Sequence, residues 1–416
     1  MNAKYIHIGK STILWEKASF TRVFKFLKNN SLSRAELSDG NGNVKNIHYG
    51  DILIKFSECL YTDEGNNIPY IINDNIAYKL LKLSPLINGD IVFSDAAEDN
   101  TVGKCVEIIT HNGTDLVAGL HTIPCRPTIK FAEGYLGYYL NSTAFHNQLL
   151  QYIQGTKISS ISKKSICQTI ISYPSEIINQ QKIVSYFQSL DSLIQTTSKK
   201  LASLKQIKAA SLQSMFPQEG ETVPKVRFKG FEGEWEKVPF GSFLKESYER
   251  STVENEDILL SSAITGMYLN SELFGHQRGA SNIGYKKIKK NMLILSAQNL
   301  HLGNANVNLR FEHGLISPAY KVYEIVNISP LFLQQWIKMD STNFFFLNAT
   351  TAGASLCRKN IVWDDLYKQI VLIPSKNEQV KIGLFFSNLD KQISLQAQRL
   401  EKLKQIKAAC LDKMFV

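Results

Sequence analysis

The sequence predicts an α+β protein in which two mixed α/β domains are joined by two long helices that pack as an antiparallel coiled coil with pseudo-two-fold symmetry. A helical segment occurs twice, as residues 182–216 and 381–415, with 17 of 35 positions identical at a constant offset of 199. Each copy has the apolar spacing of a coiled coil, and each follows a segment with β-rich runs and turns. A unit used twice in this way offers two similar surfaces, which suits a two-fold partner such as duplex DNA.

The apolar residues of the repeated helix alternate at spacings of four and three, as in a coiled-coil seam. In the first copy they are Ile183, Phe187, Leu190, Ile194, Leu201 and Leu204, and the second copy repeats them 199 residues later. One seam position is polar in both copies, Thr197 and Gln396. Because such a helix cannot bury its stripe alone, the other copy is the expected partner. We favour an antiparallel pair with the domains at opposite ends, since pseudo-two-fold symmetry follows from it.

Turn chemistry sets the expected domain boundaries. Pro174 and Pro374 each end a β-rich run, and the serine after each proline can cap a helix. Ser375 and Glu378 also have the spacing of a capping box. Residues 217–234 are rich in proline, glycine and charge, which is typical of a linker. The expected parts are a globular domain at 1–174, a helix at 175–217, the linker with a second globular domain at 218–373, and a second helix at 374–416.

The two globular segments correspond at their starts and diverge afterwards. Trp15-Glu16-Lys17 matches Trp235-Glu236-Lys237 at an offset of 220, and we expect both tryptophans to be core anchors. The interiors mix β-like runs with helices, at residues 52–56, 90–94 and 292–296 for the runs and 134–154 and 330–337 for the helices. The helices and the starts of the globular segments repeat, whereas the rest of each globular segment differs. This pattern suggests that the two globular segments recognise different targets.

The composition is that of a globular protein with a basic balance. Lys plus Arg outnumber Asp plus Glu by 47 to 37, and the net charge of +10 is compatible with a polyanionic partner, although many basic proteins bind none. The six cysteines form no C-x-x-C pair and the eight histidines have no metal-binding spacing, so no zinc, redox or other metal site is predicted. Without an apolar signal core or a membrane-spanning run, we expect a soluble, cytoplasmic protein with no membrane partner.

Taken together, these residues resemble the specificity (S) subunit of type I restriction-modification enzymes. The resemblance covers essentially the whole chain. Its marks are L-D-x-x-I at Leu190 and Leu389, the L-K-Q-I-K-A-A tails, P-K-V-R-F-K-G-F-E-G-E-W at 224–235, I-H-Y-G-D-I at 47–52 and G-T-K-I at 155–158. The first half begins with I-H-I-G at residues 6–9 in place of the P-K-V-R-F lead-in. Each piece alone is weak, but their order and duplication are specific.

The resemblance implies different roles for the globular domains and the long helices. Residues 1–174 and 218–373 would contain two target recognition domains, each reading one half of a split site in double-stranded DNA. The helices would act as a spacer that sets the gap and recruits two methylation subunits, which methylate adenine at N6 using S-adenosylmethionine. Two restriction subunits, with ATP and Mg, would complete the complex. The S subunit itself would carry no catalytic site and no cofactor.

Basic residues are the DNA-binding candidates. At the junctions between domain and helix these are Lys157, Lys163 and Lys164 in the first half and Arg358 and Lys359 in the second. Loop-like segments add Arg34, Arg126, Arg278 and Arg310. Lysine and arginine mixed with serine and glycine suit phosphate contacts, and arginine is the commonest reader of guanine. The structural alternatives, solvated turns and surface salt bridges, remain open for all of them, as they do for the lysine run 286–290.

Polar residues that are identical in both helices are the candidates for subunit docking. They are Lys205, Gln206 and Lys208 in the first copy and Lys404, Gln405 and Lys407 in the second. A solvated helix face is the alternative, but the seam requires only its apolar residues to repeat. We therefore favour a pseudo-symmetric docking surface for the two methylation subunits.

Two other functions remain as alternatives. Asn67-Ile68-Pro69-Tyr70 is similar to the N-P-P-Y motif of adenine methyltransferases, in which the aromatic ring stacks on a flipped base. The first proline is missing, and no glycine-rich loop for the methyl donor follows a strand, so an ordinary turn is the better interpretation. The remaining alternative is a coiled-coil assembly scaffold that reads no DNA.

Overall fold

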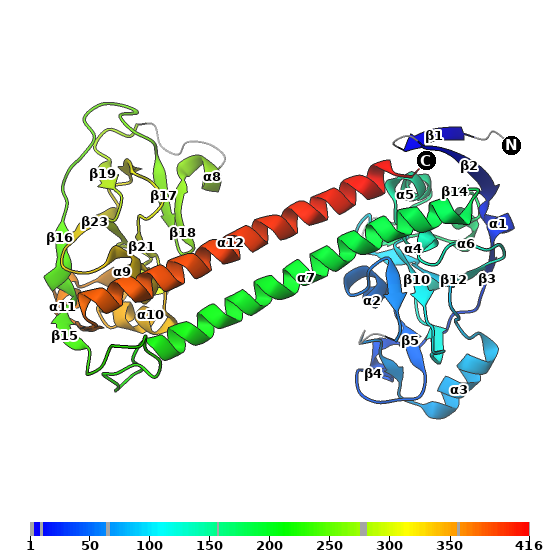
Figure 1. Ribbon diagram of the computed structural model, residues 1–416, viewed down its shortest axis with the longest axis horizontal. Helices are drawn as coiled ribbons and strands as arrows, with labels where there is room; N and C mark the ends of the chain where they lie inside the picture. Colours follow the sequence, from blue (N-terminus) through cyan, green and yellow to red (C-terminus); the bar gives the residue numbers. More distant parts are fainter. Residues whose placement is uncertain are drawn as a thin grey trace. The chain divides into compact units, whose positions relative to one another are not determined.

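The computed structural model describes residues 4–8, 11–63, 67–155, 158–274, 281–355 and 358–415, without the side chains of residues 4–8, 11–12, 352–355 and 358. The chain forms two compact units (Figure 1). Unit 1 contains residues 1–197 and 399–416, and unit 2 contains residues 198–398. Each unit therefore includes one part of α7 (Ile177–Met215) and one part of α12 (Lys376–Lys413).

Sheets of three, five and four strands build the globular part of unit 1. The first has the order β1 (Lys4–Ile8), β2 (Ser11–Ser19), β14 (Ile170–Pro174), and both of its pairs are antiparallel. The second has the order β3 (Phe24–Phe26), β12 (Thr122–Pro127), β8 (Ile91–Ser94), β10 (Cys105–Ile109), β6 (Cys59–Tyr61), with β10 and β6 parallel. The third has the order β11 (Leu116–Ala118), β5 (Lys45–Ile47), β7 (Tyr70–Ile71), β4 (Leu37–Ser38). A short pair joins β9 (Ala96–Ala97) to β13 (Ser159–Ser160).

Short helices surround these sheets: α1 (Phe20–Val23), α2 (Tyr49–Ile54), α3 (Asp74–Leu83), α4 (Tyr135–Leu140), α5 (Thr143–Leu150) and α6 (Lys163–Ile166). The expected strand at residues 52–56 is wrong, because α2 occupies most of it. Its N-terminus is capped by His48, whose ring accepts a hydrogen bond from the Gly50 amide. The expected helix at 134–154 is two helices, because Ser142 caps the start of α5 and the Asn141 side chain binds the Gly137 carbonyl.

Unit 2 uses smaller sheets. Its largest has the order β16 (Leu244–Glu246), β23 (Tyr320–Ile325), β20 (Leu293–Ser296), β21 (Ala305–Val307). The two-stranded pairs are β15 (Glu236–Pro239) with β26 (Ile370–Ile373), β17 (Leu260–Ala263) with β18 (Gly266–Leu269), β19 (Lys286–Lys289) with β22 (His313–Ile316), and β24 (Thr350–Ser355) with β25 (Arg358–Ile361). The helices are α8 (Asn270–Phe274), α9 (Pro330–Trp336), α10 (Asp340–Leu347) and α11 (Trp363–Lys368). The helix expected at 330–337 is α9, and the run expected at 292–296 is β20.

The same core contacts recur in both units. In unit 1, Phe415, just after the end of α12, stacks on Phe187 of α7 with ring centroids 5.8 Å apart. In unit 2, Phe216, which directly follows α7, lies 6.1 Å from Phe386 of α12, and these two residues correspond to Phe415 and Phe187 at the offset of 199. The expected core anchor of each half is buried as well, Trp15 at 0% and Trp235 at 3% exposure. The duplication seen in the sequence is therefore also a duplication of packing.

The two helices run antiparallel within each unit. In unit 1, Tyr186 contacts Cys410 and Asp191 pairs with Lys407, so the residue number rises along one helix as it falls along the other. In unit 2, Asp390 pairs with Lys208. The seam residues Ile183, Leu190 and Leu204 are buried, as are Ile382 and Leu389. The expected α+β fold with antiparallel helices is confirmed.

The segment expected to be a linker is tied to unit 2. The Arg227 guanidinium binds both carboxylate oxygens of Glu378 at 2.6 and 2.9 Å and also donates to the Gly233 carbonyl. The Val226 amide donates to the Ser214 carbonyl at the end of α7. Glu378 is 1% exposed and binds Arg227 through both carboxylate oxygens. Its carboxylate therefore makes this ion pair and does not form the expected capping box.

Buried glutamines join each globular domain to its helix. In unit 1, Gln180 accepts a hydrogen bond from the Ala132 amide and donates to the Pro174 carbonyl. In unit 2, the corresponding Gln379 accepts from Ser329 and donates to Pro374. Both glutamines are at most 3% exposed, so each side chain satisfies two backbone groups that water cannot reach.

Replacing either buried glutamine with leucine is expected to lower the free energy of unfolding of its own unit by about 1–3 kcal/mol, because buried backbone groups lose their partners. Urea unfolding followed by hydrogen exchange of peptides from each unit measures this. The matched control is Gln181→Leu, since Gln181 is the exposed neighbour of Gln180. Equal effects for Gln180→Leu and Gln181→Leu would contradict the prediction.

Candidate nucleic-acid interface

In unit 1, the place where α4 meets both long helices holds an ionic cluster, which we call the α4 corner. Lys407 of α12 lies 2.6 Å from Asp191 of α7 and 2.6 Å from Glu58. The Tyr138 hydroxyl of α4 donates to Asp191 at 2.7 Å, and Lys407 lies over the Tyr138 ring. The carboxylate of the L-D-x-x-I motif therefore connects its own helix, the opposite helix and the globular domain.

One amine stands between two carboxylates in this corner. Burial lowers the pKa of Lys407, but Glu58 and Asp191 outweigh it, so the net pKa is raised above its usual value. The Lys407 side chain is 14% exposed, and those of Glu58 and Asp191 are 15% and 31% exposed. The cluster is a fully engaged, largely buried ion pair network.

The corresponding place in unit 2, the α9 corner, has a different charge balance. Lys208 of α7 lies 2.5 Å from Asp390 of α12, and Gln335 of α9 donates to the same carboxylate at 3.2 Å. Lys338, three residues after Gln335, donates to the Ile264 carbonyl at 2.7 Å. Burial, with a contribution from the nearby Lys208 charge, lowers the pKa of Lys338 to about 8.

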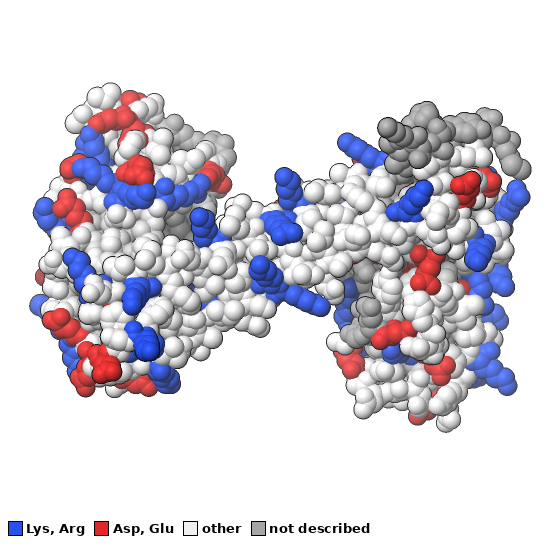
Figure 2. Space-filling view, in the orientation of Figure 1, with Lys and Arg blue, Asp and Glu red and all other residues white. Residues whose placement is uncertain are grey.

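These contacts change the interpretation of the docking candidates. Lys208 and Lys407 are not on a solvated face, because each reaches across to the aspartate of the opposite helix. The other four candidates, Lys205, Gln206, Lys404 and Gln405, are exposed. On the face shown in Figure 2, basic side chains lie along the long helices.

An apolar pair on the same tails was missed by sequence reasoning. Ile207 and Ile406 are identical between the copies and are 49% and 37% exposed. Ala210 and Ala409, one turn further along each helix, are exposed as well. The sequence contained a signal for these residues, because they are identical in both helices although they lie outside the coiled-coil seam.

The arginine candidates are engaged inside the protein. Arg126 binds Asp90 through two nitrogens, both at 2.7 Å, and Asp90 is fully buried. Arg310 binds both oxygens of Glu272 and lies over the Phe311 ring.

Arg34 is also paired, since it lies 2.7 Å from Asp51 and 3.4 Å from Asp39. Any of these arginines would have to exchange a carboxylate for DNA. The surface salt bridge left open as an alternative is therefore what the structure contains for Arg34 and Arg310.

The junction candidates are only partly described. Lys163 and Lys164 are exposed in the first turn of α6, and Lys163 lies over the Phe26 ring at 5.5 Å. Lys359 lies in β25 and its charge lowers the pKa of His301, second to burial. Lys157, Arg278 and the side chain of Arg358 lie outside the described residues.

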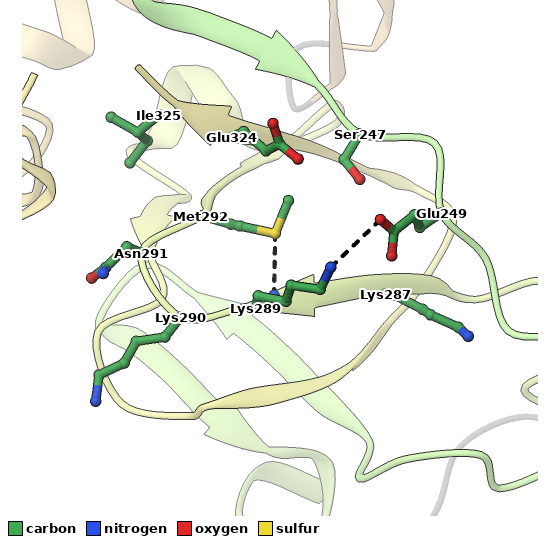
Figure 3. A pocket seen from close by; sticks show the side chains of 9 residues that line it. All are labelled: Ser247, Glu249, Lys287, Lys289, Lys290, Asn291, Met292, Glu324 and Ile325. Carbon is green, nitrogen blue, oxygen red and sulfur yellow. Dashed lines mark hydrogen bonds and ion pairs between the residues drawn. The ribbon is translucent and has the colours of Figure 1, made fainter. Parts of the chain in front are cut away.

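The lysine run of β19 is largely neutralised. Lys287 pairs with Glu256, Lys290 with Glu312, and Lys289 with Glu249 at 3.5 Å. Figure 3 shows Lys289 directed across a hollow toward Glu249, while Lys287 and Lys290 point away from it. With one carboxylate for each of these lysines, this strand is a poor electrostatic site for phosphate.

A polar aromatic cluster in unit 1 was not predicted as a site. Tyr49 packs edge-on against His121 at 5.3 Å and tilts against His48 at 4.6 Å. His121 has a φ of 54°, an unusual backbone conformation for histidine, and its ring lies 3.1 Å from Asp95. Such strain gathers at functional sites, but the sequence carried no signal for it because the φ angle depends on tertiary contacts.

The N-P-P-Y-like segment lies next to a strand. Ile68 is buried, the Pro69 carbonyl accepts a hydrogen bond from Asn46, and Tyr70 begins β7. Among the described residues no group of histidine, cysteine, aspartate and glutamate is arranged to hold a metal. In the same ranges no helix combines the length and apolarity needed to cross a membrane.

Comparison with known proteins gives one family and one fold. Residues 14–206 match the family model of the type I restriction modification DNA specificity domain. The S subunit of a type I restriction-modification system from M. genitalium aligns with TM-score 0.59 and 12% identity, covering 99% of this chain and 98% of that one. A chain from a structure on complex assembly and conformational transition of the type I R-M system aligns with TM-score 0.52 and 14% identity, covering 96% and 97%. No curated protein has a significant sequence match.

The two corners are expected to respond differently to loss of their lysine. Lys407→Met should destabilise unit 1 by about 3 kcal/mol, because two largely buried carboxylates lose their partner. Lys208→Met should cost under about 1 kcal/mol, because Asp390 is 42% exposed and water replaces the amine. Hydrogen exchange of the helix amides in each unit measures both. A loss for Lys208→Met as large as that for Lys407→Met would count against this account.

Proposed function

We propose that this chain is a specificity subunit of a type I restriction-modification system and directs a methylation complex to a split DNA sequence, which the family match of residues 14–206 and the similar fold support. The globular part of unit 1 reads one half of the site and that of unit 2 reads the other. The long helices set the gap between the halves. The chain acts in the cytoplasm on double-stranded DNA.

The observation that supports this proposal most directly is that the long helices repeat their contacts with the globular domains. The globular domains themselves do not repeat. Phe187 and Phe386, Gln180 and Gln379, and the two helix aspartates repeat their contacts in both units. The sheets do not repeat, since their strand orders and sizes differ between the units. A frame that holds two different domains in the same way is suited to reading two different half-sites.

In this proposal the chain is not an enzyme and holds no cofactor. Two methylation subunits carry S-adenosylmethionine and transfer the methyl group to adenine N6. Restriction subunits, with ATP and Mg, complete the restriction complex. The contribution of this chain is binding energy and position, which bring the target base to a partner's active site.

The docking surface is proposed on the repeated tails. Lys205, Gln206 and Ile207 in unit 2 and Lys404, Gln405 and Ile406 in unit 1 are exposed and identical. Identical exposed residues give two copies of one partner the same surface to bind. An exposed isoleucine beside polar residues matches the apolar centre and polar rim of protein interfaces.

Replacing residues 235–352 with the equivalent segment of another specificity subunit is expected to change one half of the methylated sequence. The other half and the gap should stay the same, because unit 1 and the helices are unchanged. The measurement is a genome-wide map of N6-methyladenine in cells that express the chain with its methylation subunit. If no split motif depends on this chain, the specificity assignment fails and the assembly scaffold becomes the leading interpretation.

Changing the repeated isoleucines to lysine is expected to remove methylation subunits one at a time. Ile207→Lys or Ile406→Lys alone should leave one subunit bound at limiting concentration, and the double variant none, because a charge replaces the apolar centre of each interface. Native mass spectrometry reads the stoichiometry. Leu395→Lys is the matched control, since Leu395 is a 53% exposed apolar residue of α12 that does not repeat. Full assembly of the double variant would refute this surface.

A further inference from the structure

The α9 corner of unit 2 has more amines than carboxylates. Asp390 supplies the carboxylate of this corner, and burial and then the nearby charge of Lys208 lower the pKa of Lys338. Lys208 takes this carboxylate, and Lys391 is the exposed neighbour of Asp390 in α12. Among the described residues no ion pair is formed by Lys338 or Lys391. This corner therefore carries two uncompensated positive charges.

The α4 corner of unit 1 is an internal comparison with a different balance. There Lys407 faces two carboxylates, Glu58 and Asp191. The residue that corresponds to Lys391 is Ser192, and Asn141 stands three residues after Tyr138, where unit 2 has Lys338 three residues after Gln335. Lys104 also interacts electrostatically with Glu58, so two amines balance two carboxylates at the α4 corner, whereas the α9 corner is basic.

A hollow of about 570 Å³ adjoins the α9 corner. Lys391 and Gln334 line it, together with Gly266 of β18 and Arg310, which follows β21. No carboxylate lines this hollow among the described residues. Lys338 binds the carbonyl of Ile264 in the turn that leads to Gly266, so the corner and the hollow share the β17–β18 turn.

We propose that the α9 corner and its hollow bind a backbone phosphate of the DNA through Lys338 and Lys391. This inference rests on the proposed function, because it assigns a DNA contact to one unit of the specificity subunit. The α4 corner makes no such contact, so the two units hold the DNA backbone unequally.

The chemistry of the corner selects a phosphate over a base edge. The two lysines supply only donors and positive charge, without an oriented acceptor that could distinguish bases. Asn306, which also lines the hollow, already uses its amide nitrogen to bind Ser262 and the Ala263 carbonyl. The contact should therefore add affinity without sequence preference.

The test uses the complex assembled with methylation subunits and measures DNA binding over a range of salt concentrations. Lys338→Met with Lys391→Met is expected to reduce the slope of log affinity against log salt by about 1, since one phosphate contact is lost and each contributes about one. The reduction should be the same for the specific duplex and for a random one. Lys338→Arg with Lys391→Arg should retain the slope, because the charges remain.

The matched control is Lys237→Met with Lys368→Met, an equal charge change on two exposed lysines of unit 2 that lie outside the corner. A slope for the Lys338 and Lys391 double variant no lower than that of the control would overturn the phosphate site. So would a loss confined to the specific duplex, because that would indicate base reading. Binding of ATP alone to the wild-type complex, lost in the double variant, would reassign the corner to a free nucleotide and also overturn the proposal. Absence of sequence-selective binding by the wild-type complex would instead refute the proposed function.

Discussion

Each long helix has an apolar stripe that it cannot bury by itself, and the rest of the structure follows from how this stripe is covered. In each unit the cover has two parts, the opposite helix and a short helix of the globular domain. Phe187 contacts both parts of this cover, since it stacks on Phe415, which follows α12, and on Tyr138 of α4. Because one stripe takes both partners, pairing of the helices and seating of the globular domain depend on each other within a unit.

The helix aspartates add a polar constraint to this apolar one. Asp191 and Asp390 each bind a lysine of the opposite helix and a side chain of the globular domain. A shift of one helix by a turn would leave a partly buried carboxylate without its amine, which costs more than the aligned pair gains. The ion pairs therefore select one register, while the stripe supplies most of the stability.

The two corners show how a repeated frame can acquire different properties. The aspartate and the lysine are the same in both, but their surroundings differ, with Glu58 beside one lysine and Lys338 near the other. Only one corner is left with uncompensated amines. Elsewhere several basic residues are paired with carboxylates, as Arg126, Lys287 and Lys290 are, so net charge alone says little about where a polyanion would bind.

The sequence by itself determined the frame. The period of 199, the spacing of four and three, and the repeated tryptophans predicted long antiparallel helices with two mixed domains, because these features depend on local periodicity and burial. The resemblance to type I specificity subunits rested on the same motifs, and residues 14–206 match that family's model. Residues 52–56 were placed in a strand because a short apolar run does not distinguish a buried strand from a helix capped by His48.

Tertiary structure decided which charges are free. Lys208 and Lys407 could not be identified as ion-paired from sequence, because Asp390 lies 182 residues from Lys208 and Glu58 lies 349 residues from Lys407. The engagement of Arg34, Arg126 and Arg310 and the uncompensated amines of Lys338 and Lys391 were equally invisible. Whether a lysine is neutralised depends on neighbours from distant segments, and only the folded chain brings those neighbours together.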